Sequence, residues 1–296
     1  MLNSVLRRLK DTKDVLLGNK KIQPAPVAHI FREELSLQDL QDFEIADEKM
    51  KEYLSNISIE FCFSEFGEQR VNAGGASFTL QNRLDPSIST LKKYFPEAKY
   101  SVYSDFDLQI QGVNLNRIVA SPVPEKDHER YLYRTADYFK FKSLLESDAD
   151  FCCVLDTDMF VVSEDIYSLV YLTEKFGFSA PYNSRNLLRK DMKISLDTGK
   201  IDDLSNALGH SYNQSPMTLW KNHPQGREFY KKCCEIMLKE PSRASLVMWK
   251  AARETGFSPY LLPQQWCVCA DDVGIGNEIM LHVGHQKVAE YYHVKL

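Results

Sequence analysis

Short apolar runs alternate with amphipathic segments from Ile57 onward, and this alternation predicts the fold class. Runs typical of buried strands lie at Ile57–Phe63, Tyr100–Tyr103, Arg117–Ala120 and Phe151–Leu155. Helical patterns lie at Ser87–Tyr94, which Pro96 stops, and at His128–Ser147. Strands that alternate with helices indicate a mainly parallel sheet with crossover helices. We therefore expect an α/β domain whose ligands bind beyond the carboxyl ends of the strands.

The first 17 residues have the pattern of a basic amphipathic helix. Leu2, Val5, Leu6 and Leu9 follow the helical i, i+3, i+4, i+7 spacing, and arginines and lysines surround them. Such a helix can lie on an anionic membrane surface, but packing on its own domain or on a second subunit is the favoured interpretation. Partners expected here are thus a membrane surface, as a peripheral contact, or a second copy of the chain.

The stretch that follows predicts the domain boundary. Lys20–Pro26 carries two prolines without periodicity, which favours a linker, and Leu35–Leu54 reads as a polar helix. We expect an N-terminal helical extension and linker over residues 1–55 and one α/β domain over 56–296. The polar segment Lys190–Asp203 is expected to be a mobile loop near an active site or an exposed connection.

Composition and charge narrow the function classes. The net charge of −5 and the pI of about 5.9 argue against a general nucleic-acid binder. No apolar run approaches the roughly 20 residues that span a bilayer, and no secretory signal is visible, so a cytoplasmic location is expected. The seven cysteines include two adjacent pairs, whose side chains diverge, and we expect buried, reduced thiols.

The strand Phe151–Leu155 runs directly into Asp156-Thr157-Asp158, and an apolar run returns the chain to the interior. On an extended backbone the two carboxylates lie on one side. Two hard oxygen donors at a strand end suit Mg²⁺ or Mn²⁺ with substrate phosphates completing the shell. Asp is also common in strand-end turns, but its place between two apolar segments favours the metal site.

This segment resembles the Asp-x-Asp strand of nucleotide-sugar glycosyltransferases with the GT-A fold, and most closely glycosyltransferase family 8, the galactosyltransferase and glycogenin-like group. In that family a helix with basic residues precedes the strand, and here the predicted helix carries Arg134 and Lys140. The family ends in a His, Gly, Lys signature, which His282, Gly284 and Lys287 resemble, with the His one residue closer to the Gly. Leu262–Trp266 resembles a family segment upstream of that signature.

The resemblance implies a GT-A type domain, a hexosyltransferase activity and a set of site residues. Asp156, Asp158 and His282 would bind Mn²⁺ or Mg²⁺, with His285 as the alternative to His282. The donor, a UDP-hexose, would contact Asp105, Arg134, Lys140, Thr157, Gly284 and Lys287. A glycan or lipid-linked acceptor would contact Asn213, Gln214 and Ser215.

One departure leaves the chemistry at the anomeric carbon open. The family places an acidic-amide pair before the Leu-Pro segment, whereas Ser242–Met248 contains neither acid nor amide. The catalytic residue and the stereochemical course are therefore unassigned. A sugar-nucleotide nucleotidyltransferase is the alternative enzyme, although the turn after the first strand, Phe63–Arg70, carries two acids instead of a basic Gly-rich loop. A metal-dependent phosphohydrolase would need more clustered His and Asp metal ligands than this sequence has. A non-catalytic nucleotide-sugar-binding module is the remaining alternative.

Overall fold

The computed structural model describes residues 49–72, 80–183, 212–269 and 272–294. All the described helices and strands belong to one compact unit, residues 44–296. The predicted basic helix over 1–17, the linker at 20–26 and the loop at 190–203 lie outside the described residues.

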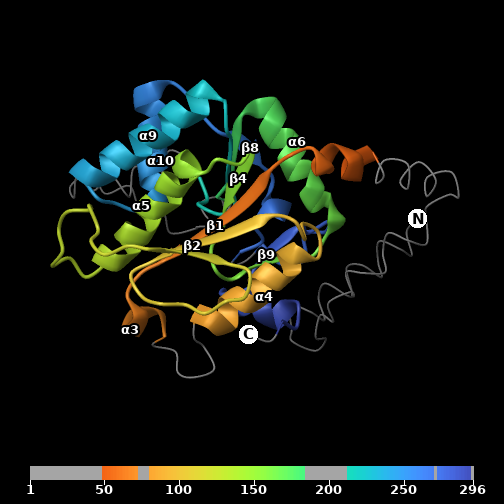
Figure 1. Ribbon diagram of the computed structural model, residues 1–296, viewed down its shortest axis with the longest axis horizontal. Coiled ribbons are helices and arrows are strands. Elements are labelled where there is room, and N and C mark those ends of the chain that lie inside the picture. Colours follow the sequence, from red (N-terminus) through yellow and green to blue (C-terminus); the bar gives the residue numbers. More distant parts are fainter. Residues whose placement is uncertain (1–48, 73–79, 184–211, 270–271, 295–296) are drawn as a thin grey trace, which may run out of the picture. The chain divides into compact units, whose positions relative to one another are not determined.

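A seven-stranded sheet forms the centre of this unit (Figure 1). Its order is β3-β2-β1-β4-β7-β6-β8, and of these seven described strands only β7 runs antiparallel to its neighbours. The strands are β1 (Ile59–Glu65), β2 (Lys99–Ser104), β3 (Asn114–Arg117), β4 (Phe151–Val154), β6 (Phe178–Pro181), β7 (Met217–Trp220) and β8 (Tyr260–Leu262). The predicted α/β class with a mainly parallel sheet is therefore confirmed.

Burial explains why the central strands were visible in the sequence. Every residue of β4 is buried, and β1 is buried over its five inner residues. The third strand differs from the expected Arg117–Ala120 and lies at Asn114–Arg117. It is an edge strand with no buried residue, so its position follows from hydrogen bonding to β2 rather than from apolar content.

Helices cover both faces of the sheet (Figure 1). Side chains of α4 (Leu80–Lys92) and α6 (Tyr167–Phe176) share one apolar cluster with the strands. The other face is covered by α5 (Tyr131–Glu146), α9 (Pro224–Lys239) and α10 (Ala244–Thr255). Shorter helical segments are α3 (Glu68–Val71), η1 (Glu164–Ile166), η2 (Gln264–Trp266) and α11 (Gln286–Tyr291).

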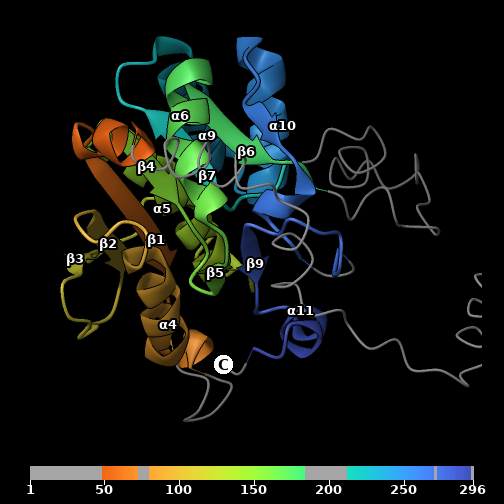
Figure 2. The ribbon, with the colours of Figure 1, turned by 90° about the vertical axis from the view of Figure 1, so that its right-hand side faces the viewer.

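A second, two-stranded sheet brings the C-terminal segment back to the end of β4 (Figure 2). It pairs β5 (Met159–Val161), which follows the Asp-x-Asp turn, with the antiparallel β9 (Met280–His282). The strand β9 ends at His282, one of the predicted metal ligands. Its partner strand follows the turn directly, so the two predicted metal-binding segments become neighbours.

The residues just before β1 pack on this unit. Residues 49–55 are helical, and Tyr53 donates a hydrogen bond to Glu174 of α6 at 2.6 Å and lies edge-on to Tyr171. Leu54 and Ile57 pack against the same apolar cluster as α4 and α6.

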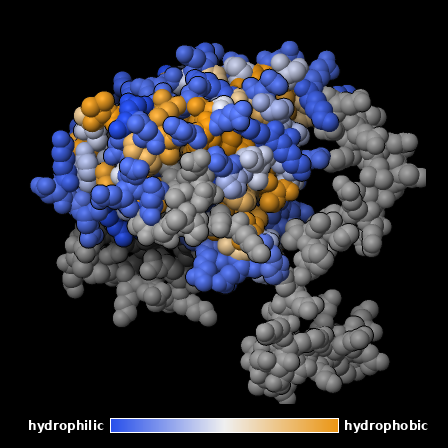
Figure 3. All heavy atoms as spheres, turned by 60° about the horizontal axis from the view of Figure 1, so that its bottom comes forward, coloured by the Kyte–Doolittle hydropathy of each residue, from blue (hydrophilic) through white to orange (hydrophobic). Residues whose placement is uncertain are grey.

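The surface of the unit is mixed in character. Figure 3 shows one face on which hydrophobic side chains gather mainly in the upper half, among hydrophilic ones. The described helices include none that combines the length and the apolar character needed to cross a membrane. All seven cysteines are free and buried, and their burial agrees with the sequence prediction.

Candidate functional site

A cavity of about 910 Å³ opens where β1 and β4 end. Its wall includes Ser64 and Glu65 from the end of β1, Asp156 and Asp158 from the turn after β4, and His282 from the end of β9. The side of α5 and the first residues of α10 complete it. The cavity therefore lies at the carboxyl ends of parallel strands, where an α/β sheet presents its ligands.

The turn that carries the two aspartates is held by its backbone on both sides. The Asp156 amide donates to Ser215 Oγ at 2.8 Å, and the Asp158 carbonyl accepts from the Val283 amide at 3.0 Å. Thr157 between them is buried, and its hydroxyl points to Glu65 at 3.5 Å. With the backbone fixed, both carboxylates face the cavity and are only 13–14% exposed.

His282 reaches the same turn from the end of β9. The β5–β9 register places it opposite Met159, one residue beyond Asp158. Its Nε2 lies 3.1 Å from Asp158 Oδ1 and 3.8 Å from Asp156 Oδ2. Two carboxylates and one imidazole, which are distant in the sequence, thus converge on one point at the cavity wall.

The charges of this group are coupled. Burial works against a charged imidazole, but Asp158 and Asp156 outweigh it and raise the pKa of His282 to about 9. Burial also works against an ionised Asp158, yet His282 and the more distant Arg83 hold the pKa of that carboxyl at about 2. In this arrangement the histidine is an imidazolium at neutral pH, paired with two carboxylates.

The donor set fits a divalent cation in its chemistry. Carboxylate oxygens and an imidazole nitrogen are ligands that Mn²⁺ accepts, and cation binding would replace the proton on His282. The ring's Nδ1 is buried and has no hydrogen-bond partner within the described part of the chain. Among the described residues, no three or more His, Cys, Asp or Glu side chains are arranged as they stand to hold a metal ion.

Gly284 permits the close approach of the C-terminal segment to Asp158. A Cβ at this position would lie 1.8 Å from Asp158 Oδ2 and 2.8 Å from its Cγ. Only a residue without a side chain allows the carboxylate to keep this position. The geometry shows Gly284 making room for a predicted metal ligand, and its donor-binding role stays a prediction.

The neighbours of Gly284 differ in their relation to the cavity. The ring of His285 lies edge-on to that of His282, with centroids 4.6 Å apart, and His282 is the one that contacts the carboxylates. Lys287 lies in α11 and is absent from the cavity wall. Its predicted contact with a diphosphate stays a prediction.

The predicted donor residue Lys140 reaches the aspartate turn from α5, lines the cavity and is 5% exposed. Its ammonium forms an ion pair with Asp156 and lies 3.6 Å from Asp137 Oδ1, one helical turn earlier on α5. Burial works against the charge, but the two carboxylates more than offset it and raise the pKa of Lys140. The lysine therefore stays charged and links Asp156 to a second acid.

Asp137 is a cavity residue that the sequence analysis missed. Burial raises its pKa to about 6, although Lys140 works in the opposite direction. Asp137 lies three residues before Lys140 on a predicted helix, so both side chains lie on one face. This spacing is the sequence signal that could have identified Asp137 as a site residue. Glu65 was missed as well; it ends β1 and pairs with Arg70, whose guanidinium stacks 4.0 Å from the Tyr133 ring centre.

The other predicted donor residues have different surroundings. Arg134 lines the cavity and is held by Glu125 at 2.9 Å and by His128 Nε2 at 3.1 Å. Asp105 is not part of the cavity wall; its carboxylate accepts a hydrogen bond from the Gly67 amide at 2.7 Å, fixing the turn after β1.

The predicted acceptor residues lie between the cavity and the core. Asn213 is buried, and its amide nitrogen lies 3.1 Å from Cys267 Sγ. Ser215 is buried and holds the Asp156 backbone. Gln214, once its amide is oriented to match its neighbours, donates to Asp137 and accepts from Lys140, both at 3.1 Å. Asn213 and Gln214 line the cavity; the acceptor role of all three stays a prediction.

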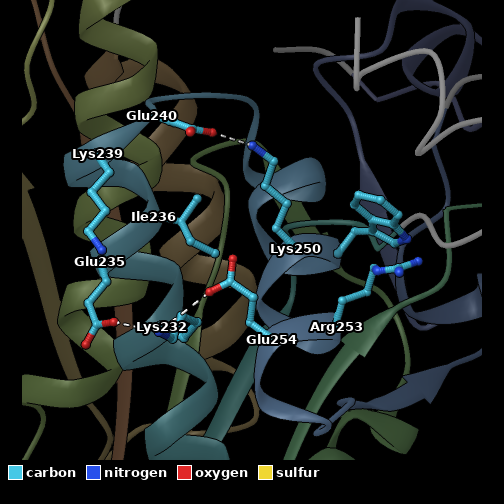
Figure 4. Close-up of a pocket in the computed structure, with 9 residues that line it drawn as sticks. Lys232, Glu235, Ile236, Lys239, Glu240, Lys250, Arg253 and Glu254 are labelled. Carbon is cyan, nitrogen blue, oxygen red and sulfur yellow. Dashed lines mark hydrogen bonds and ion pairs between the residues drawn. The ribbon is translucent and has the colours of Figure 1, made fainter. Parts of the chain in front are cut away.

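Two other cavities have no comparable meeting of carboxylates with a histidine in their walls. One of about 280 Å³ lies between α9 and α10, where Lys232 pairs with Glu235 and Glu254 and Lys250 pairs with Glu240 (Figure 4). Another, of about 610 Å³, lies at the opposite end of β1 and is lined by Leu54, Tyr94 and Phe95 among others. Surface ion pairs and apolar walls alone point to no chemistry.

The chain resembles known proteins in structure rather than in sequence. No protein-family model matches the chain, and no curated protein matches its sequence. Among solved structures, the crystal structure of mouse xyloside xylosyltransferase 1 in its apo form is similar, with a TM-score of 0.46 and 9% sequence identity. The match covers 76% of this chain and 97% of that one.

Proposed function

We propose that the chain is a metal-dependent glycosyltransferase, which moves a hexose from a UDP-sugar to an acceptor hydroxyl. The observation that carries the proposal is the meeting of Asp156, Asp158 and His282 at the wall of one large cavity. The mainly parallel sheet, with the cavity at its carboxyl edge, supports the GT-A type of domain that the sequence resembles.

The donor diphosphate is assigned to the corner between the aspartate turn and β9. Asp156, Asp158 and His282 would hold Mn²⁺ or Mg²⁺, which when bound stabilises the negative charge that develops on the leaving diphosphate. The backbone bonds to Ser215 and from Val283 fix both ends of the turn, and binding a cation would require the ligand side chains to move apart and His282 to lose its proton.

Cations of the chain itself supply further charge. Lys140 is buried, charged and in contact with Asp156, so it orients that carboxylate and presents an ammonium to the cavity. Arg134 is held on the same side by Glu125 and His128. Fixed cations that face a low-dielectric cavity are effective in stabilising a leaving diphosphate.

The competing functions predict different products. A nucleotidyltransferase would bind a nucleoside triphosphate beside the turn after β1, but Glu65 places a carboxylate there and engages Arg70. A binding module would bind UDP without turnover. The acceptor is proposed to be a glycan or lipid-linked sugar, and the location to be cytoplasmic with a peripheral membrane contact as the alternative.

A donor screen tests the proposal. The protein is incubated with UDP-glucose, UDP-galactose, UDP-xylose and GDP-mannose in Mn²⁺, Mg²⁺ or excess EDTA, and nucleoside diphosphate release is measured. We expect slow release from a UDP-sugar with Mn²⁺ and none in EDTA. Pyrophosphate release from UTP and a sugar 1-phosphate would identify a nucleotidyltransferase, and UDP binding without any release would identify a binding module.

A further inference from the structure

We propose that Asp137 and Gln214 bind hydroxyl groups of the donor sugar, with Lys140 holding both side chains in place. This inference rests on the proposed function and specifies which part of the donor each side of the cavity receives. It gives a role to Asp137, for which none was predicted, and moves Gln214 from the acceptor to the donor sugar.

The three side chains form a closed set of contacts. Asp137 Oδ2 accepts from the Ala244 amide at 3.2 Å, which docks the carboxylate on the start of α10. Its Oδ1 faces Lys140 Nζ at 3.6 Å and the Gln214 amide nitrogen at 3.1 Å. Gln214 in turn accepts from Lys140 Nζ at 3.1 Å. Each side chain is thus oriented by the other two, and Asp137 also by the Ala244 backbone.

The set lies beside the proposed diphosphate site. Lys140 contacts Asp156 as well as Asp137, so one ammonium separates the sugar-binding pair from the metal-binding turn. Asp137, Gln214, Lys140 and Asp156 all line the same cavity. A sugar joined to a diphosphate at Asp156 would extend from that point, and this wall is within its reach.

The chemistry of the pair matches sugar hydroxyls. A hydroxyl both donates and accepts hydrogen bonds; a carboxylate has about four acceptor sites, and an amide offers two donors and an acceptor. Asp137 has two contacted oxygens but unused lone pairs, and it is 14% exposed towards the cavity. Hydroxyl-bearing neutral sugars therefore suit this wall, whereas a sugar carboxylate would meet Asp137 with like charge.

The start of α10 fixes the position of the Asp137 carboxylate at this end of the cavity. It contributes Ser242, Arg243 and Ser245 to the cavity, and thus no acid or amide of its own. Asp137 reaches the same place from α5 through its bond to the Ala244 backbone. The carboxylate and amide are thus supplied at this end of the cavity by α5 and by the segment before β7.

The test compares binding of UDP with binding of a UDP-sugar. Calorimetric titrations with UDP, UDP-glucose and UDP-galactose, in Mn²⁺, are made on the wild type, Asp137→Asn and Gln214→Ala. Glu146→Gln is the matched control, since it removes the same charge from the far end of α5, where Glu146 pairs with exposed Lys142. Losing a hydrogen bond to a charged group lowers affinity about tenfold or more.

We expect Asp137→Asn to bind the better UDP-sugar at least about tenfold more weakly, and Gln214→Ala several-fold more weakly, while the UDP affinity of neither variant falls. Retained UDP binding shows that the variant is folded, and the control should match the wild type for every ligand. Equal effects on UDP and UDP-sugar, or none on either, would overturn the inference while leaving the proposed function standing. If the wild type binds neither UDP nor UDP-sugars, both the proposed function and this inference are wrong.

Discussion

The imidazole Nε2 of His282 lies 3.1 Å from Asp158 Oδ1, which joins the C-terminal strand β9 to the turn after β4. The contact exists because β9 pairs with β5, the strand that begins directly after Asp158. Gly284 leaves the space that Asp158 needs. The consequences of this contact for metal binding and for stability can be measured.

Removing the Asp158 charge should abolish metal binding and turnover. Asp158→Asn keeps the shape of the side chain but loses an anionic oxygen donor, so we expect Mn²⁺ affinity and UDP release to fall at least about a hundredfold. Calorimetry and the release assay measure both. Asp107→Asn, at a carboxylate that is 88% exposed, is the control and should resemble the wild type. Wild-type Mn²⁺ affinity in Asp158→Asn would remove this residue from the site.

The His282–Asp158 pair should give the metal-free protein a specific pH dependence. The folded-state pKa of His282 is raised from 6.5 to about 9, so its contribution is complete below pH 6.5 and is lost as pH rises through 9. The pKa of Asp158 is lowered from 3.8 to about 2, so its contribution is present above pH 3.8 and is lost as pH falls through 2. Stabilisation by the pair is therefore greatest between about pH 4 and 6.5.

Urea unfolding of the wild type and His282→Asn in EDTA, at pH values from 6 to 9.5, measures this effect. The difference in the free energy of unfolding between the two should shrink by up to about 3 kcal/mol as pH rises through that range. A difference that is constant with pH would show that His282 is not charged in the folded protein.

Lys140 should be essential for stability, unlike its neighbour Lys142 on the same helix. Lys140→Met leaves Asp137 and Asp156 without their shared buried cation, and loss of one partner of a buried ion pair costs about 3–5 kcal/mol. Lys142→Met breaks only a pair whose side chains are 38% and 45% exposed, so we expect a change within about 0.5 kcal/mol. Urea unfolding compares them, and equal losses would contradict the assigned role of Lys140.

Gly284→Ala should damage the site more than the fold. The added methyl group would meet the end of the Asp158 side chain, which can rotate away and leave His282. We expect Mn²⁺ affinity to fall about tenfold or more, as when other groups that position metal ligands are changed. Gly226→Ala adds the same methyl group in α9, against Leu219 and Phe178, and should keep the Mn²⁺ affinity of the wild type. An unchanged affinity in Gly284→Ala would show that this close approach is not required.

The sequence predicted those parts of the molecule that depend on local pattern. The buried strands β1, β2 and β4 and the helix α5 lie close to their predicted ranges, because apolar runs and periodicity follow burial directly. The edge strand β3 was displaced, because hydrogen bonding to β2 fixes its position. Asp156 and Asp158 were visible because they directly follow a fully buried strand.

The remaining parts of the site depend on tertiary contacts. The meeting of His282 with the aspartate turn was expected only from resemblance to a family signature, and the β5–β9 pairing that produces it has no local pattern. Asp137 and Glu65 were missed because an acid on a helix or at a strand end is ordinarily solvated. Only the packing of α5 against α10 and of Arg70 against Tyr133 places them at the cavity.

The most direct test of the central claim is a crystal structure with Mn²⁺ and UDP, in which anomalous scattering locates the manganese. We predict one strong peak within about 2.0–2.4 Å of an Asp158 oxygen and a His282 nitrogen, close to Asp156 and bridged to the UDP diphosphate. His282 would then have given up its proton and its bond to Asp158. A peak elsewhere, or UDP bound in the cavity with no manganese at these side chains, would contradict the account.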